Sequence, residues 1–215
     1  MVNYEGENIS EAQIKAFRKV LQANWEESLA KNPKGDEKGW NKALLEITEG
    51  RKSTYDPKTK KRTYFYSWCG DWVSYHLWKT GCRHKCLNRE AVNGKWEPGN
   101  NLSLLTAWAG DHRWLPKSLK NRFAKDISAG TSWHPWDNKK DVCTDGYEPR
   151  TGDLLILPRK NGDHIEFFVN RKDQIVTVSA GAQSGGVALL RKRDIDIEDL
   201  VAVIDIDKLV CKEPF

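Results

Sequence analysis

The sequence has no long hydrophobic run. None of its 215 residues belongs to a window of about 18 apolar residues, so no segment is expected to span a membrane. Residues 1–7 contain neither a basic start nor an apolar stretch and do not resemble a signal peptide. We therefore expect synthesis in the cytoplasm and, for a site of action outside it, delivery by a route other than general secretion.

The chain also lacks a strong excess of charge of either sign. Lys and Arg number 35 and Asp and Glu number 30, which gives a formal net charge of +5. The densest basic stretch, residues 58–62, follows Asp56-Pro57 and is predicted to be a solvated turn. We expect no nucleic-acid partner, because a nucleic-acid surface needs clustered basic residues. The mild positive charge is compatible with an anionic polymer such as a bacterial cell wall.

Internal repeats and low-complexity linkers are absent, and the length suits a single domain over residues 1–215. A capping box at residues 10–13 and apolar residues at helical spacing predict a helix that ends before Pro33. A second short helix is predicted over 41–49. We interpret residues 1–50 as a helical extension and residues 82–147, rich in tryptophan, as an insertion.

Strand-like segments gather in the second half of the chain. Their apolar runs are separated by turn residues, which predicts a β meander. The expected strands are 153–157, 164–170, 175–179, 187–191 and 201–206, and a strand pair is expected over 51–66. Helices first and antiparallel strands later indicate an α+β fold.

Cysteine is sparse, with five residues in the chain, and an odd number leaves one thiol over when the others pair. Cys69 is the natural unpaired one, because an aromatic run gives way there to a predicted helix over 69–79 that ends at Gly81. The start of a helix stabilises a thiolate and offers backbone N–H groups to an oxyanion. Gly70 lets a substrate approach closely. Cys69 is therefore a candidate nucleophile, with a buried structural cysteine as the alternative.

His164 opens an apolar strand behind the turn at Gly162-Asp163. At the start of a strand, its imidazole is well placed to point out of the sheet at a neighbouring helix end. A histidine that activates a thiol also needs a partner for its far ring nitrogen. Thr177, Ser179 and Gln183 are candidates for this role, and the residues themselves do not choose among them.

Two other kinds of site compete with the thiol–imidazole pair. Cys82, His84 and Cys86 could bind zinc with His76, His112 or Cys143 as a fourth ligand. A second distant cysteine pair is missing, which favours a Cys82–Cys86 disulfide or two free thiols instead. Within the insertion, a glycosidase-type pair of carboxylates is another alternative. Its candidates are Asp111, Asp137, Asp141 and Asp145, with His112 and His134 nearby.

Three short motifs occur in a familiar order. They are Trp68-Cys69-Gly70-Asp71-Trp72-Val73-Ser74-Tyr75, then Pro149-Arg150-Thr151-Gly152-Asp153-Leu154-Leu155-Ile156-Leu157, then Gly162-Asp163-His164-Ile165-Glu166-Phe167-Phe168-Val169. This order resembles the papain-like NlpC and CHAP-type cysteine peptidases and amidases, which cut the peptide part of bacterial peptidoglycan. The stretch 179–184 is similar to one that follows the histidine strand in some members. The resemblance covers about residues 64–80 and 149–191 and implies a papain-like fold.

The resemblance implies roles for individual residues. Cys69 would be the nucleophile, His164 the base and Gln183 the third polar residue, with Ser179 as the alternative. Trp68, Gly70, Asp163 and Ser179 are expected to contact the substrate, and no cofactor or metal is expected. Asp163 departs from the pattern, because glycine often precedes the histidine in the family.

The implied partner is peptidoglycan, and two biological settings fit a wall hydrolase without a signal peptide. One is an antibacterial effector delivered into a rival's periplasm by a type VI secretion apparatus, with an immunity protein as a further partner. The other is a phage lysin. A non-catalytic module that binds the wall, or one stabilised by zinc, is the alternative from another class.

Overall fold

The computed structural model describes the chain in several stretches. The described residues are 7–31, 53–56, 58, 61–64, 69–82, 133–157, 164–181, 189–194 and 200–210. The helix predicted over 41–49 lies outside them, as does most of the segment 82–147.

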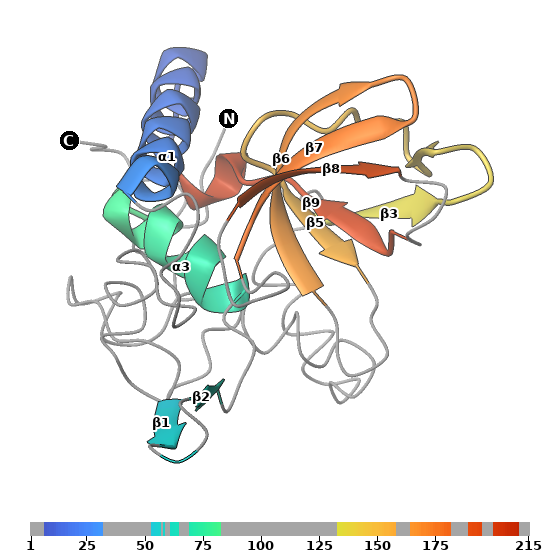
Figure 1. The fold of residues 1–215 in the computed structure, drawn as a ribbon. Helices are drawn as coiled ribbons and strands as arrows, with labels where there is room; N and C mark the ends of the chain where they lie inside the picture. Colours follow the sequence, from blue (N-terminus) through green and yellow to red (C-terminus); the bar gives the residue numbers. More distant parts are fainter. Residues whose placement is uncertain are drawn as a thin grey trace, which may run out of the picture.

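An antiparallel sheet forms the centre of the fold (Figure 1). Six strands in the order β3-β9-β5-β6-β7-β8 form its body, and the two-residue β4 extends it beside β3. The strands are β3 (Trp133–Asp137), β4 (Val142–Cys143), β5 (Leu154–Leu157), β6 (His164–Lys172), β7 (Ile175–Ala180), β8 (Leu189–Asp194) and β9 (Ala202–Ile204). A separate antiparallel pair consists of β1 (Ser53–Asp56) and β2 (Lys61–Tyr64).

Two α-helices in the described ranges accompany the sheet, α1 (Glu11–Lys31) and α3 (Cys69–Lys79), together with the short 3-10 helix η1 (Asp207–Leu209). This combination is α+β, as the sequence predicts. The capping box at the start of α1 is confirmed, because the Ser10 N–H donates to Gln13 Oε1 at 3.0 Å and the Gln13 N–H to Ser10 Oγ at 3.3 Å. No helix in these ranges combines the length and apolar character that crossing a bilayer requires.

The end of α3 has the geometry that glycine at a helix end permits. Gly81 has φ +94°, its N–H donates to the Trp78 carbonyl, and the Cys82 N–H donates to the Leu77 carbonyl, both at 2.9 Å. These two bonds form a Schellman motif. Sequence signals at both ends therefore place α3 correctly, with Cys69 as its first residue.

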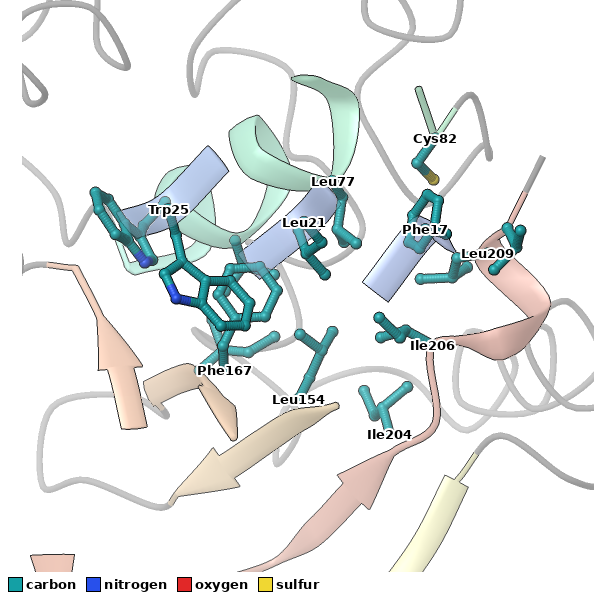
Figure 2. Packing of buried hydrophobic residues seen from close by; sticks show 14 of the residues in the cluster. Phe17, Leu21, Trp25, Leu77, Cys82, Leu154, Phe167, Ile204, Ile206 and Leu209 are labelled. Atoms are coloured by element: carbon teal, nitrogen blue, oxygen red, sulfur yellow. The ribbon is translucent and has the colours of Figure 1, made fainter. Parts of the chain in front are cut away.

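The two faces of the sheet bury separate groups of apolar side chains. On the helix side, Ile165 and Phe167 of β6 pack with α1 and α3, as Figure 2 shows for Phe167 beside Trp25 of α1. On the opposite face, Phe168 packs in a second cluster with residues of β5, β7 and β9. Each large apolar side chain buried in this way contributes about 1.5–3 kcal/mol. Side chains alternate between the faces along β6, and both faces are covered.

The β6–β7 hairpin has one irregularity. Pairing is regular up to Phe168↔Val178, and a bulge follows between Phe168 and Asn170. The hairpin turns at Asp173, whose φ of +54° is a left-handed conformation that aspartate tolerates. The bulge separates the first half of β6, which pairs with β5, from the exposed half near the turn.

A group of charges, most of them buried, attaches α1 to the sheet. The Arg18 guanidinium, 11% exposed, reaches Asp153 Oδ1 at 2.7 Å, Asp207 Oδ1 at 2.6 Å and Asp205 Oδ1 at 3.1 Å. Arg150 Nη2 contacts Asp207 Oδ2 at 2.6 Å and Asp205 Oδ1 at 3.1 Å. Burial and the neighbouring Asp207 carboxylate raise the pKa of Asp205. We call Arg18, Arg150, Asp153, Asp205 and Asp207 the charge cluster.

The Gly152-Asp153 motif belongs to this attachment. Gly152 has φ +97°, and a Cβ there would stand 3.1 Å from Ile206 Cδ1 and 3.3 Å from Leu21 Cδ2. Glycine therefore lets α1 approach the start of β5 closely. Asp153 forms an ion pair with Arg18 of α1, so both residues of the motif contribute to the packing of α1 on the sheet.

The segment predicted as an insertion also contributes to the sheet. Within 82–147, residues Trp133–Asp137 form β3, which pairs with β9, and Val142–Cys143 form β4. The segment that we interpret as an insertion therefore includes two strands of the main sheet. Residues 133–137 do not resemble a strand in sequence, since they include Pro135 and the charged Asp137. Their strand conformation depends on pairing with β9, about 70 positions away in the chain.

Candidate active site

Cys69 is the first residue of α3, and its side chain is buried, with 2% of the residue exposed. It is not in a disulfide bond, and neither are the other described cysteines, Cys82 and Cys143. The N–H groups of a first helical turn have no partners within the helix, and the helix dipole is positive at this end. Both features stabilise negative charge on a sulfur or an oxygen placed there.

His164 is the first residue of β6, so its imidazole stands at the end of the sheet, within reach of the first turn of α3. Its Nε2 lies 2.7 Å from Glu166 Oε1, and the two side chains are 4% and 0% exposed. A hydrogen bond also joins the imidazole to Cys69. The structure therefore brings together Cys69 and His164, which the sequence placed about a hundred positions apart, and adds Glu166.

The electrostatics of the imidazole follow from these contacts. Burial lowers the His164 pKa, but hydrogen bonds to Cys69 and Glu166, with the negative charges of both groups, outweigh burial and raise the pKa to about 9. The imidazole is therefore protonated at neutral pH and can accompany a thiolate. Together, Cys69 and His164 have the geometry and charge of a thiolate–imidazolium pair.

Glu166 is the residue that sequence reasoning missed. A signal was present, because residues two apart on a strand project from the same face. His164 and Glu166 pair with Leu157 and Leu155 of β5. A carboxylate inside an otherwise apolar strand also needs a partner, since burying an unpaired charge is costly.

The remaining predicted site residues divide into two groups. Gly70 is buried beside Cys69 in the first turn of α3. Ser179, at 0% exposure, has its hydroxyl 3.3 Å from the Trp72 indole N–H, which donates to it. Trp68, Asp163 and Gln183 lie outside the described residues.

The zinc interpretation is tested in part by His76. This histidine is buried, and its Nδ1–H donates to the Trp72 carbonyl at 2.7 Å while its Nε2 accepts from the Ser28 hydroxyl at 2.9 Å. Both ring nitrogens are therefore occupied, so His76 is a structural histidine between α3 and α1. Cys82 packs in the hydrophobic core (Figure 2), whereas His84, Cys86 and His112 lie outside the described residues.

Within the described ranges, no group of three or more His, Cys, Asp or Glu side chains could hold a metal ion. Cys143 is buried, and burial together with the charges of Asp145 and Asp153 raises the pKa of its thiol to about 12. A protonated thiol is a poor metal ligand and a poor nucleophile.

The buried His76 leads to a prediction about acid stability. Burial lowers its pKa to about 3. An unfolded histidine titrates near 6.5, so between these values the unfolded state binds one proton more than the folded state. Stability should therefore fall as pH decreases from about 6.5 towards 3, by up to about 1.4 kcal/mol per pH unit. Urea unfolding at a series of pH values measures this slope.

The variant His76→Gln isolates the contribution of this histidine. A glutamine can still bond to Ser28 and the Trp72 carbonyl, but it does not titrate. Its slope between pH 6.5 and 4 should be smaller than that of the wild type. Equal slopes in the two proteins would contradict the assignment.

The described acidic residues considered for a glycosidase site lie near the sheet edge formed by β3 and β4, away from β6. Asp145 Oδ2 accepts from His134 Nδ1 at 2.8 Å, and the His134 ring stacks on Tyr147 with centroids 3.8 Å apart. Asp137 and Asp141 flank the β3–β4 turn. Two strands separate β3 from β6, a distance of roughly 14 Å. These carboxylates are therefore separate from His164, and Asp111 lies outside the described residues.

Comparison of the chain with protein-family models, with curated proteins and with solved structures finds no match in any of the three. A function for the site must therefore be argued from the chemistry of its own residues.

Proposed function

We propose that the protein is a cysteine hydrolase of papain-like type that cleaves an amide bond in the peptide part of bacterial peptidoglycan. The observation that carries the chemistry is the hydrogen-bonded contact of Cys69, at the start of a helix, with a buried, protonated His164. Nucleophile and base in contact, with the base held by a third group, are the signature of covalent catalysis by a thiol. The substrate class rests on the resemblance of the three motifs to wall-directed cysteine hydrolases.

The proposed reaction has two halves. The Cys69 thiolate attacks the amide carbonyl, and the negative oxygen is stabilised by N–H groups at the start of α3. His164 gives its proton to the leaving amine as the carbon–nitrogen bond breaks, which leaves a thioester on Cys69. His164 then removes a proton from water, the hydroxide displaces the thiolate, and a free carboxylate is released.

The experiment is digestion of purified sacculi followed by mass analysis of the soluble muropeptides. We expect pairs of products whose summed masses exceed the mass of the intact muropeptide by one water, with a new carboxylate on one product and a new amine on the other. The identity of these ends locates the bond. Digests that are identical to a buffer control, across sacculi of different cross-bridge chemistry, would refute peptidoglycan as the substrate.

The two alternatives from the sequence make different predictions in this assay. A non-catalytic wall-binding module would co-sediment with sacculi and release nothing. A cysteine hydrolase that acts on a different amide would leave sacculi intact and still cleave protein or small amide substrates in a manner that depends on Cys69.

A further inference from the structure

We propose that Glu166 is the positioning residue of this site, which orients His164 and stabilises its charged form. Cys69, His164 and Glu166 then form one unit that is carried by α3 and β6 alone. The inference rests on the proposed function, because it assigns the third role in the same site. It replaces a residue from β7 or the segment after it with one from the strand of His164 itself.

The contact between Glu166 and His164 has the geometry this role requires. Glu166 Oε1 lies 2.7 Å from His164 Nε2, which leaves Nδ1 as the ring nitrogen available to the Cys69 thiol. Both side chains are buried, so neither solvent nor rotamer exchange competes with the bond. Because the residues are two apart on one strand, their backbones hold them on the same face without help from another segment.

The register of the sheet argues against the described candidates on β7. Ser179 pairs with Phe167, and directly opposed residues share a face. Phe167 packs on the helix side, whereas His164 and Glu166 alternate with it onto the other face. Ser179 therefore lies on the opposite face of the sheet from Glu166, and its hydroxyl accepts from the indole N–H of Trp72 in α3.

Thr177 is too far along the strand. It pairs with Asn170, six residues beyond His164 in β6. At the rise of a β-strand, six residues span roughly 20 Å. A threonine side chain cannot cover this distance.

The charge of Glu166 matters as well as its position. Leu155 and Leu157 of β5 lie opposite Glu166 and His164, and α3 contributes Cys69, so the imidazole has apolar neighbours and two acidic ones. In such surroundings a carboxylate stabilises an imidazolium much more than a neutral amide does. An amide at this position would orient the ring but would let it lose its proton nearer to neutral pH.

The test compares Glu166→Gln with the matched control Asp145→Asn. Glutamine keeps the size of the side chain and an acceptor oxygen but removes the charge. Asp145 holds another histidine, His134, at a similar distance of 2.8 Å on a distant strand. The readout is the pH profile of kcat/KM for sacculus digestion, with thermal unfolding as a check that each variant is folded.

In the wild type, the alkaline limb of this profile should lie near pH 9, where His164 loses its proton. In Glu166→Gln the limb should move down by about one to two pH units, with about a 3- to 25-fold loss of kcat/KM at pH 8.5. Asp145→Asn should keep the wild-type profile. An alkaline limb that stays in place in a folded Glu166→Gln would overturn the role of Glu166.

A second measurement does not depend on the substrate. The titration of the His164 ring is followed by nuclear magnetic resonance in protein with labelled histidines, of which the chain has five. His164→Gln identifies the signal. We expect the His164 ring of the wild type to stay protonated at pH 8, and this measurement does not require Glu166→Gln to fold. In folded Glu166→Gln, the same ring should titrate nearer to neutral pH. A wild-type ring that is neutral at pH 8 would also overturn the proposal.

The two readouts separate this inference from the proposed function. If sacculi are not cut but Glu166→Gln lowers the His164 titration, Glu166 has the proposed effect and the substrate is wrong. If sacculi are cut by a Cys69-dependent enzyme and Glu166→Gln changes neither readout, the hydrolase remains and the role of Glu166 fails.

Discussion

Replacing Cys69 with alanine should reduce amide hydrolysis by about 1,000-fold or more, to the level of a blank digest. The sulfur supplies both the attacking electron pair and the covalent intermediate, and alanine supplies neither. His164 alone cannot compensate, because one of its ring nitrogens is bonded to Glu166 and the variant has no thiol left for the ring to activate. The measurement is the initial rate of muropeptide release at equal protein concentration.

Cys143→Ala is the matched control for this variant. Cys143 is also a buried thiol, with 1% of the residue exposed, but its high pKa keeps it protonated. Its removal should leave the rate within about twofold of the wild type, because it lies outside the proposed site. If Cys69→Ala releases products at the wild-type rate, Cys69 is not the nucleophile. Equal loss in both variants would indicate damage to the fold.

The second large effect is expected on stability, from Arg18→Met. The substitution leaves the Asp153 carboxylate, whose side chain is 0% exposed, without its guanidinium partner, and it removes one of two cations that face three carboxylates. Breaking a buried ion pair by deleting one partner costs about 3–5 kcal/mol. For a chain of this length, the melting temperature should fall by about 6–20 °C.

Lys19→Met controls for the loss of a positive charge from the same helix. Lys19 is exposed on the outer surface of α1, so its replacement should change the melting temperature by no more than about 1–2 °C. Arg18→Lys should be nearly as harmful as Arg18→Met, since an ammonium group cannot bond to the three carboxylates together. Arg18→Met with the melting temperature of Lys19→Met would show that the charge cluster does not hold α1 in place.

The sequence was a good guide wherever local signals determine structure. The capping box fixes the start of α1, and Gly81 fixes the end of α3 through a left-handed conformation. The strands β5, β6 and β7 begin and end close to the positions that the sequence predicts. Cys69 and His164 could be singled out because each lies at the end of an element, where its neighbours in sequence already indicate its setting.

Features that depend on distant contacts were harder to predict. His76 has an acceptor four residues away in its own helix, but its second partner, Ser28, is 48 positions away. Sequence alone therefore left it as a candidate zinc ligand. Arg18 likewise looks like a surface residue of an amphipathic helix until residues 153, 205 and 207 are seen around it.

Glu166 was overlooked for a different reason. Its position beside His164 was visible, but the choice of the third residue depends on the register between β6 and β7, which an alternating pattern does not specify. Once Ser179 is known to pair with Phe167, it faces the wrong side of the sheet. The pattern His-x-Glu at the start of a strand is therefore worth testing before residues on the next strand.

The bulge in β6 bears on how this protein can change during evolution. Insertions or deletions in a hairpin normally alter the register of both strands, and a shift of one residue would turn His164 and Glu166 to the other face. Here the irregularity between Phe168 and Asn170 can absorb such a change before it reaches the half of β6 that pairs with β5. We therefore expect that a change in the length of the turn around Asp173, or a reporter peptide inserted there, would leave the pairing of β5 with β6 unchanged.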